Sequence, residues 1–298
     1  DSLPSITREK IKRFLLNKIR KETPEGKKEG LSHGRVKHIK STLSGIMTQA
    51  VEDGYIAVNP VSRIGYIFNS KDQNLDNEIS PYTAKELDSY LKECEKRFST
   101  HYPFFLTLAR TGMRLGEALA LKPGDVDFSG NFIEIKRAYV ENRLTTPKSG
   151  KSRRVDMSPH LASTIKALIH QNKVTAVKKG WGDLPEWLFF NEEGNPLDQG
   201  NLRARVHYKI CEKSNFRRIR IHDLRHSYAT IRISAGHNIA DVSRQLGHAS
   251  IKITVDTYYH WIPNQSSDEV EELDNLGKNR NNPQPIRNQN KKDLAAVS

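Results

Sequence analysis

The amino-acid sequence predicts a mainly α-helical protein with a small antiparallel β-sheet, which is an α+β fold class. Two observations predict this class: apolar residues recur at intervals of three and four along most of the chain, and β-prone residues gather mainly between residues 132 and 155. A polar stretch over residues 66–82 divides the helical pattern and reads as a linker. We therefore expect a small helical domain over residues 1–65, a larger domain over residues 83–262 and a tail over residues 263–298.

The N-terminal part, residues 1–65, predicts two amphipathic helices. Residues 5–22 carry one apolar stripe, which is formed by Ile11, Phe14, Leu15 and Ile19. Ser32 is the expected N-cap of a longer helix. Asn59-Pro60 stops the helical pattern of this part, because the residue before a proline avoids the helical conformation.

The larger part begins with a helix that Thr83 and Glu86 are expected to cap reciprocally. A second helix ends at Gly112, and Arg114 opens the next one. β-prone runs then surround residues 132–140 and Val155, and the turn between them is rich in lysine and arginine.

Further helices complete the prediction. One is basic and carries Arg203 and Arg205. In the tail, residues 267–276 predict a short acidic helix with a small apolar edge. Residues 279–298 are rich in Asn, Gln, Pro and Lys, a composition typical of disorder.

The stretch from residue 221 to residue 260 gathers chemically capable side chains. His222 and Arg225 are three residues apart and share one face of a helix. Asn238 can cap a second helix that ends at Gly247, and His248 and Tyr258 follow. Arginine binds phosphate in a bidentate manner, histidine transfers protons near neutral pH, and tyrosine can be a covalent nucleophile. These residue types together predict phosphate chemistry.

Three blocks in this stretch, HDLRHS, LGHAS and DTYYH, resemble the catalytic segment of the tyrosine recombinases, the phage-integrase family. Upstream, TGMRLGEALAL resembles the block of the family's first catalytic arginine, and PKSGKSRR its β-hairpin lysine block. The segment GLSHGRVKHIKSTLSGIMTQAVEDGYIAVNP resembles the second half of the helical core-binding domain. The resemblance therefore implies a tyrosine recombinase catalytic fold that a partial core-binding domain precedes. The family normally has further helices before this point, so we expect an N-terminal region to be missing.

The resemblance also implies a role for each matching residue. Arg114 and Arg225 would hold the DNA phosphate, with Glu117 supporting the first of them. Tyr258 would be the nucleophile that forms a 3′-phosphotyrosyl bond, and His260 would support it. Lys148 would protonate the leaving 5′-oxygen, with Lys151 as its rival, and His222 and His248 would assist.

The formal net charge of +13 favours a nucleic-acid or an anionic membrane partner. The resemblance favours double-stranded DNA attachment sites, bound by a homotetramer on synapsed DNA, with accessory DNA-bending proteins or an excisionase as further partners. The expected DNA contacts come from both parts of the chain: Arg35, Lys37, Lys40, Arg153, Arg203 and Arg205. Arg153 could equally face water.

Bland alternatives exist for each residue. A histidine in a helix is more often structural than catalytic, and lysines in hairpin turns are usually solvated. A tyrosine near a helix end is more often part of a core or interface. The family order of Arg, Lys, HxxR, His and Tyr favours the recombinase. Rival functions are a type IB topoisomerase, a chromosome-dimer-type recombinase and a non-catalytic DNA-binding protein on a decayed fold.

Other classes lack sequence support. No apolar run is long enough for a membrane span, and no secretory signal pattern is seen. No CxxC, HExxH or Walker glycine loop is present, so we expect no metal and no cofactor. The two cysteines do not form a disulfide framework, and the expected setting is the reducing bacterial cytoplasm, in association with the nucleoid.

Overall fold

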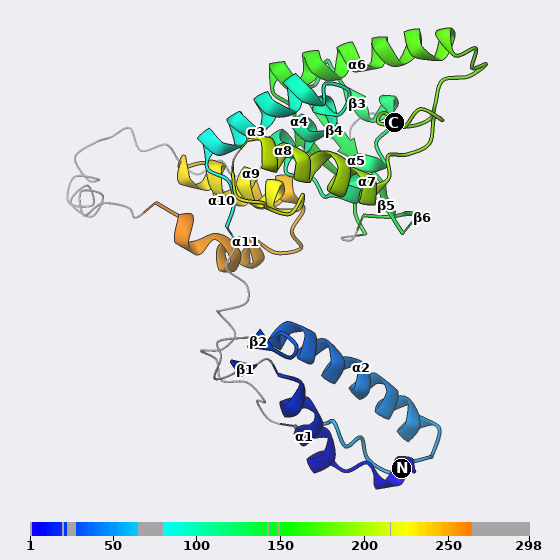
Figure 1. Cartoon of the computed structure of the whole chain (residues 1–298), viewed down its shortest axis with the longest axis vertical. Helices are drawn as coiled ribbons and strands as arrows, with labels where there is room; N and C mark the ends of the chain where they lie inside the picture. The colour runs from blue at the N-terminus through cyan, green and yellow to red at the C-terminus, as the bar shows by residue number, and fades with distance from the viewer. Residues whose placement is uncertain are drawn as a thin grey trace, which may run out of the picture. The chain divides into compact units, whose positions relative to one another are not determined.

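The computed structural model describes residues 2–19, 21–22, 28–64, 80–141, 143–147, 150–214 and 216–263. The chain divides into two compact units, Asp1–Ser80 and Pro81–Ser298 (Figure 1). Most of the expected linker and nearly all of the expected tail lie outside the described residues, as does Lys148.

The first unit is built from two helices, α1 (Arg8–Lys18) and α2 (His33–Glu52). Short strands β1 (Lys21–Glu22) and β2 (Lys28–Glu29) pair antiparallel between them. Ser32 caps α2 as expected, since its hydroxyl accepts a hydrogen bond from the backbone of Arg35. The core of this unit joins both helices to the segment that follows α2: Ile11, Leu15, Val36, Met47, Val61 and Ile64.

One expectation for α1 is wrong. Phe14 was expected on the buried stripe with Leu15, but its side chain is 44% exposed, whereas Leu15 is fully buried. Successive helical positions are about 100° apart, so the two neighbours do not share one narrow face. The Phe14 ring instead lies under the ammonium group of Lys18, at 5.5 Å from its centroid.

The second unit is helical with small antiparallel sheets, which confirms the α+β class. Helices α3 (Ala84–Arg97), α4 (Tyr102–Thr111) and α5 (Leu115–Leu119) come first. Thr83 and Glu86 form the expected capping box. Strands β3 (Val126–Asp127), β4 (Phe132–Ile135) and β7 (Arg153–Asp156) form one sheet in the order β3-β4-β7, with Ile133 opposite Val155. Strands β5 (Ala138–Val140) and β6 (Arg143–Thr145) form a separate hairpin.

The remaining helices follow the sheet. Helix α6 (Pro159–Lys178) is followed by α7 (Gln199–Asn201), the π-helical turn η3 (Leu202–His207) and α8 (Tyr208–Lys213). Helices α9 (Asp223–Ser234), α10 (Ile239–Leu246) and α11 (Ile251–Tyr258) then carry the predicted chemical segment, and the turn η4 (Tyr259–Trp261) follows. The predicted Asn238 cap and Gly247 end of α10 are both confirmed.

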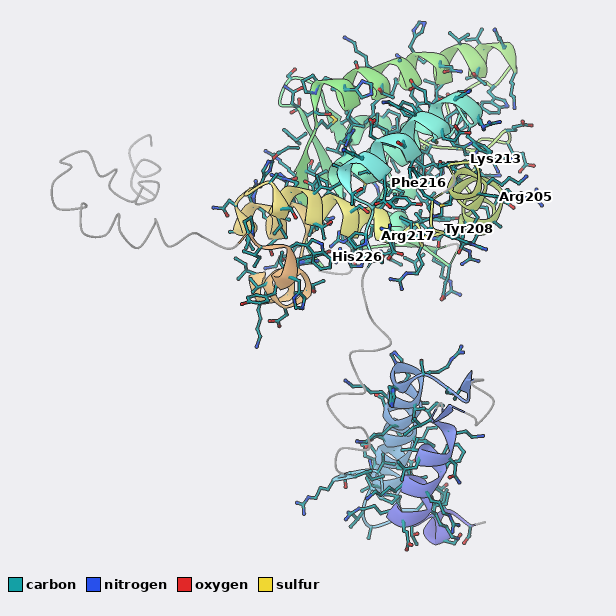
Figure 2. The ribbon with its side chains drawn as sticks, turned by 60° about the vertical axis from the view of Figure 1, so that its left-hand side comes forward. Arg205, Tyr208, Lys213, Phe216, Arg217 and His226 are labelled. Atoms are coloured by element: carbon teal, nitrogen blue, oxygen red, sulfur yellow. The ribbon has the colours of Figure 1, made fainter. Side chains whose placement is uncertain are left out.

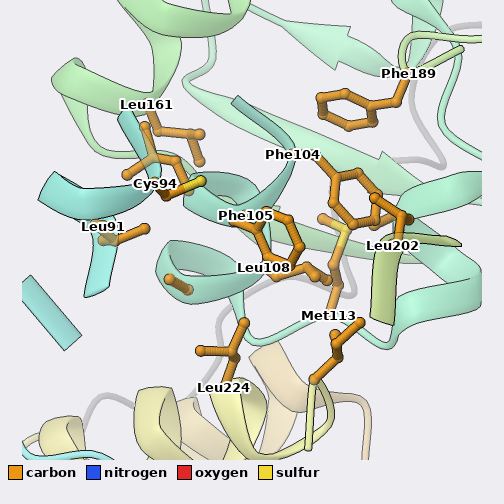
Figure 3. Packing of buried hydrophobic residues seen from close by; sticks show 14 of the residues in the cluster. Leu91, Cys94, Phe104, Phe105, Leu108, Met113, Leu161, Phe189, Leu202 and Leu224 are labelled. Atoms are coloured by element: carbon orange, nitrogen blue, oxygen red, sulfur yellow. The ribbon is translucent and has the colours of Figure 1, made fainter. Parts of the chain in front are cut away.

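Helix α4 runs through the centre of this unit and is buried almost all round. Phe104, Phe105 and Leu108 pack there against residues from α3, α6 and α9, such as Leu91, Leu161 and Leu224 (Figure 3). A second, smaller cluster joins α9, α10 and α11: Tyr228, Ala229, Ile233, Val242, Leu246 and Tyr258. The end of α4 and the start of α9 are therefore fixed against each other by packing.

Candidate active site

Arg225 and Arg114 are brought together by the end of α4. Arg225 on α9 is 4% exposed, and its Nη1 donates a hydrogen bond of 2.8 Å to the carbonyl oxygen of Gly112. Gly112 ends α4 in the left-handed conformation, with φ of +64°. A Cβ atom at this position would lie 2.4 Å from the Tyr228 ring, so only glycine fits. The turn at Gly112 thus receives Arg225 and leads directly to Arg114.

Glu117 lies between two arginines. Its carboxylate accepts hydrogen bonds from Arg114 Nη1 at 3.0 Å and from the Arg114 backbone N–H at 2.8 Å. Arg153 on β7 donates two more, at 2.8 and 2.7 Å, in a bidentate geometry. Glu117 is only 1% exposed. Burial alone would raise the pKa of Glu117, but the hydrogen bonds and charges of Arg153 and Arg114 lower it below its usual value.

The three arginines give this region an excess of positive charge. Burial, followed by the neighbouring charge of Arg114, lowers the pKa of Arg225 to about 10. Glu117 supplies one negative charge against Arg114, Arg153 and Arg225. A site of this kind is suited to an anion such as a phosphate, which would relieve the repulsion between the guanidinium groups.

Tyr258, at the end of α11, is held by a histidine that the sequence analysis did not select. His226 Nδ1 lies 2.8 Å from the hydroxyl oxygen of Tyr258. Tyr258 is 1% exposed, and its ring also packs at 6.3 Å from the ring of Trp261. The ring of His222, the N-cap residue of α9, lies 5.1 Å from the ring of His226. His222, Arg225, His226 and Tyr258 therefore belong to one neighbourhood.

The pKa values of this pair define where the proton lies. Burial raises the pKa of Tyr258 to about 12. Burial, and then the neighbouring His222, lowers the pKa of His226 to about 4. At neutral pH the tyrosine is protonated and the imidazole is neutral. We therefore assign the Tyr258 hydroxyl as the donor and His226 Nδ1 as the acceptor.

His248 follows Gly247 at the end of α10. Its Nδ1 lies 2.7 Å from the hydroxyl oxygen of Thr254 on α11. Burial, and then the charges of Arg225, Arg114 and Arg153, lower the pKa of His248 to about 4. His222 has a lowered pKa as well, because of burial and then of Arg225. Both histidines thus lie within electrostatic reach of the arginines and are neutral at pH 7.

The structure places the other selected residues differently. His260 is exposed, and its ring packs on Tyr259 at 5.9 Å rather than on Tyr258. Tyr259 itself is 66% exposed. The rival lysine, Lys151, is described and exposed.

Of the residues expected to contact DNA, two are turned towards their own unit. Arg153 is directed inward to Glu117, and its side chain is 9% exposed. The half-buried Lys40 donates to the carbonyl oxygen of Ile64 at 3.0 Å. The others are exposed: Arg35, Lys37, Arg203 and Arg205. Arg205 lies on η3, near Tyr208 and Lys213 of α8 (Figure 2).

A sequence signal for His226 was present. His226 is four residues after His222, so the two share a helix face in the HDLRH block. Its contact with Tyr258, 32 residues away, depends on how α11 packs on α9. Across the described residues, no group of three or more His, Cys, Asp or Glu side chains is arranged to hold a metal ion. No helix in the described ranges is long and apolar enough to cross a membrane.

Comparison with known proteins identifies related chains. Residues 81–264 match the model of the phage integrase family. A XerC-like tyrosine recombinase of Caldanaerobacter subterraneus subsp. tengcongensis is 28% identical over 267 residues, which are 83% of this chain and 68% of the relative. The ICEBs1 integrase of Bacillus subtilis is 26% identical over 260 residues, which are 83% of this chain and 67% of the relative. This chain thus spans about two thirds of the length of these relatives.

Solved structures show the same fold. The Tn1549 transposon integrase in complex with a circular intermediate DNA has a TM-score of 0.70 at 21% identity, over 92% of this chain and 86% of that one. The XerH site-specific recombinase bound to a palindromic difH substrate has a TM-score of 0.65 at 21% identity, over 93% of this chain and 74% of that one.

Proposed function

Because the chain belongs to the phage integrase family, we propose that it integrates a phage or an integrative element by cleaving and rejoining DNA through a 3′-phosphotyrosyl intermediate. Family membership makes it a site-specific DNA recombinase and a DNA-binding enzyme. One observation carries the finer proposal: packing connects the nucleophile to both arginines. The hydroxyl of Tyr258 contacts His226, which is next to Arg225 in the chain. Arg225 in turn donates a hydrogen bond to the turn that precedes Arg114.

The arginines have a direct role in this chemistry. When an oxygen attacks phosphorus, negative charge grows on the non-bridging oxygens. Arg114 and Arg225 carry the positive charge that stabilises it, and Glu117 fixes the orientation of Arg114. Removing a donor of this kind typically lowers the rate about 100- to 1,000-fold.

In the cleavage step a bond forms between the Tyr258 oxygen and phosphorus, and the bond between phosphorus and the 5′-oxygen breaks. Tyr258 loses its proton, and the 5′-oxygen gains one. We assign the second proton to Lys148, which lies outside the described residues, and keep the exposed Lys151 as its rival. The 5′-hydroxyl of another strand then attacks the phosphotyrosine and gives its proton to the lysine. The bond between phosphorus and the Tyr258 oxygen breaks, and Tyr258 recovers its proton. The covalent link conserves the bond energy, so rejoining requires neither ATP nor a cofactor.

His226 is better suited to orient Tyr258 than to deprotonate it before DNA binds. The pKa of Tyr258 is about 12 and that of His226 is about 4, so moving the proton from Tyr258 to His226 is strongly unfavourable before DNA binds. A bound phosphate raises the pKa of nearby histidines because the negative charge favours the imidazolium. We therefore propose that His226 accepts the Tyr258 proton only when DNA is bound, with His222 and His248 as assisting groups.

A suicide DNA substrate tests the proposal. A nick near the scissile phosphate lets the cleaved fragment diffuse away, so covalent protein–DNA complex accumulates. Tyr258→Phe is expected to abolish the covalent band and to leave DNA binding intact, while Tyr259→Phe forms the band normally. Loss of the band in Tyr259→Phe alone would assign the nucleophile to Tyr259.

Two relatives favour different biological settings, since one is XerC-like and another is an element integrase. A chromosome-dimer-type recombinase is the alternative that the first relative favours. Two assays separate these alternatives. Joining of two plasmids that carry a pair of different attachment sites would indicate an integrase, and resolution of one plasmid that carries two copies of a single site would indicate a chromosome-dimer-type recombinase. Relaxation of supercoiled DNA that carries no recombination site would instead indicate a topoisomerase-like activity.

The assembly is part of the same proposal. We assign four protomers to two synapsed DNA sites, with the segment after residue 263 docking on a neighbouring subunit and with an excisionase or a DNA-bending protein as accessory partner. Residues 264–298 lie outside the described ranges. Truncation after Asn264 is expected to spare binding to one site and to impair strand exchange. If the truncated protein recombined two sites as well as the full chain does, the docking of this segment on a neighbouring subunit would be refuted.

A further inference from the structure

We propose that Arg153 is a positioning residue that holds Arg114 and the turn before His248 in one fixed arrangement, rather than a residue that contacts DNA. The inference rests on the proposed function, in which Arg114 and His248 act during phosphoryl transfer. Arg153 lies on strand β7, outside the helices that carry most of the proposed catalytic groups.

Arg153 links three separate segments. Its Nη1 and Nη2 donate to the two carboxylate oxygens of Glu117 at 2.8 and 2.7 Å. Its Nε donates to the backbone carbonyl oxygen of Gln245, near the end of α10, at 3.0 Å. The guanidinium group therefore joins the start of α5 to the end of α10 from a strand that is itself paired with β4.

Both oxygens of the Glu117 carboxylate are fully engaged, so the carboxylate is held in one orientation. Each of its oxygens accepts one hydrogen bond from Arg114 and one from Arg153. Without Arg153, a carboxylate that is 1% exposed would lose half of these bonds. The carboxylate would then shift, or the Arg114 guanidinium would move inward towards it, because an uncompensated buried charge is strongly destabilising. The orientation of Arg114 towards a phosphate would be lost.

The chain is shaped around the Arg153 side chain at Gly247. A Cβ atom on Gly247 would lie 2.7 Å from both Cδ and Nε of Arg153. Gly247 also has a φ of +68°, the left-handed conformation that ends α10. The next residue is His248, so the same close approach that seats the guanidinium group also sets where His248 begins.

A second contact fixes the same junction. The Gln245 side chain is fully buried and pairs with the backbone N–H of Asp156 at 3.0 Å and with the Asp156 carboxylate. Strand β7 is thus hydrogen-bonded to Gln245 of α10 in two ways: Asp156 bonds with the Gln245 side chain, and Arg153 donates to the Gln245 backbone carbonyl. This geometry leaves the Arg153 side chain only 9% exposed, whereas the next residue, Arg154, is exposed and lies over the Phe132 ring.

The test compares Arg153→Gln and Arg153→Lys with Arg154→Gln, which removes the same charge from the neighbouring position. Single-turnover cleavage of the suicide substrate is measured at saturating DNA, together with the DNA dissociation constant at several salt concentrations. Displacing a catalytic group by about 1 Å can lower a rate about 100-fold. We expect Arg153→Gln to lower the cleavage rate by that factor, with an unchanged slope of log K against log salt. Arg154→Gln is expected to cleave at the normal rate.

Lysine at position 153 should not rescue cleavage, because one ammonium group cannot reproduce the planar fork that reaches Glu117 and Gln245 together. A DNA contact predicts the opposite pattern: weaker binding, a slope reduced by about 0.9, a normal rate at saturation and rescue by lysine. That pattern would overturn the inference.

Glu117→Gln provides a second route, and it is combined with Arg153→Lys in the double variant if Arg153→Gln fails to fold. It keeps the side-chain shape but replaces one acceptor oxygen with a donor. If both residues act through Arg114, each variant lowers the rate and the double variant is no slower than the slower single one. Multiplying effects would overturn the inference. A covalent link through a residue other than Tyr258 would refute the proposed function separately, since the rate comparison does not depend on which residue forms it.

Discussion

Replacing His226 with leucine tests the contact that holds Tyr258. The substitution removes the acceptor at 2.8 Å from the Tyr258 hydroxyl but keeps an apolar side chain of similar bulk. Tyr258 is 1% exposed, so its hydroxyl would be left without a partner. An unsatisfied buried hydroxyl costs about 1–3 kcal/mol, and a hydrogen bond between neutral groups contributes a net ~1 kcal/mol. We expect His226→Leu to lower the free energy of unfolding by about 2 kcal/mol.

A double-mutant cycle isolates the bond itself. Urea unfolding of wild type, His226→Leu, Tyr258→Phe and the double variant is expected to give a coupling energy of ~1 kcal/mol. All three tryptophans lie in the unit Pro81–Ser298, so their fluorescence reports on this unit alone. His226→Asn is the matched control, because its amide oxygen can accept the hydrogen bond near the position of Nδ1.

Cleavage rates should depend on the same hydrogen bond between Tyr258 and His226. We expect covalent complex to form fastest in wild type, more slowly in His226→Asn and slowest in His226→Leu, since the bond orients the nucleophile. A coupling energy below about 0.3 kcal/mol would show that the two residues act independently. It would refute the assignment of Tyr258 as a donor to His226.

Three further predictions concern acid stability, the turn at the site and DNA binding. Burial lowers the pKa of His207 to about 4, below the unfolded value near 6.5, so its contribution to stability is present above pH 6.5 and is lost as the pH falls towards 4. His207→Gln should therefore lose about 2 kcal/mol less than wild type between pH 7 and pH 5 in urea unfolding; equal losses would contradict this. Gly112→Ala should destabilise the unit by more than ~2 kcal/mol in thermal unfolding, because of its positive φ and its closeness to Tyr228, whereas Gly45→Ala in an open helical position of α2 should stabilise by about 0.5–1 kcal/mol. Arg205→Gln should reduce the slope of log K against log salt by about 0.9 if this exposed arginine contacts a phosphate, and an unchanged slope would exclude the contact.

Local sequence determined the elements and the residue types of the site. The Thr83 capping box and the Asn238 and Gly247 ends of α10 follow from side chains that bond within a few residues of themselves. Short-range patterns of this kind are readable because the interacting groups are fixed by covalent spacing. The same holds for the motif blocks, whose order and spacing indicated the family that the comparison then identified.

Tertiary packing alone decided what several of these residues do. Arg153 reads in the sequence as one more basic residue of a hairpin, and only the approach of β7 to α10, 92 residues along the chain, turns it inward. Arg225 reaches the Gly112 carbonyl across 113 residues, and His226 meets Tyr258 only because α11 packs on α9. No local pattern encodes such pairings, since a side chain's partner depends on which helix faces are buried together. The sequence by itself determined which chemical groups this protein carries, and the packing of α4, α9, α10 and β7 decided which of them meet.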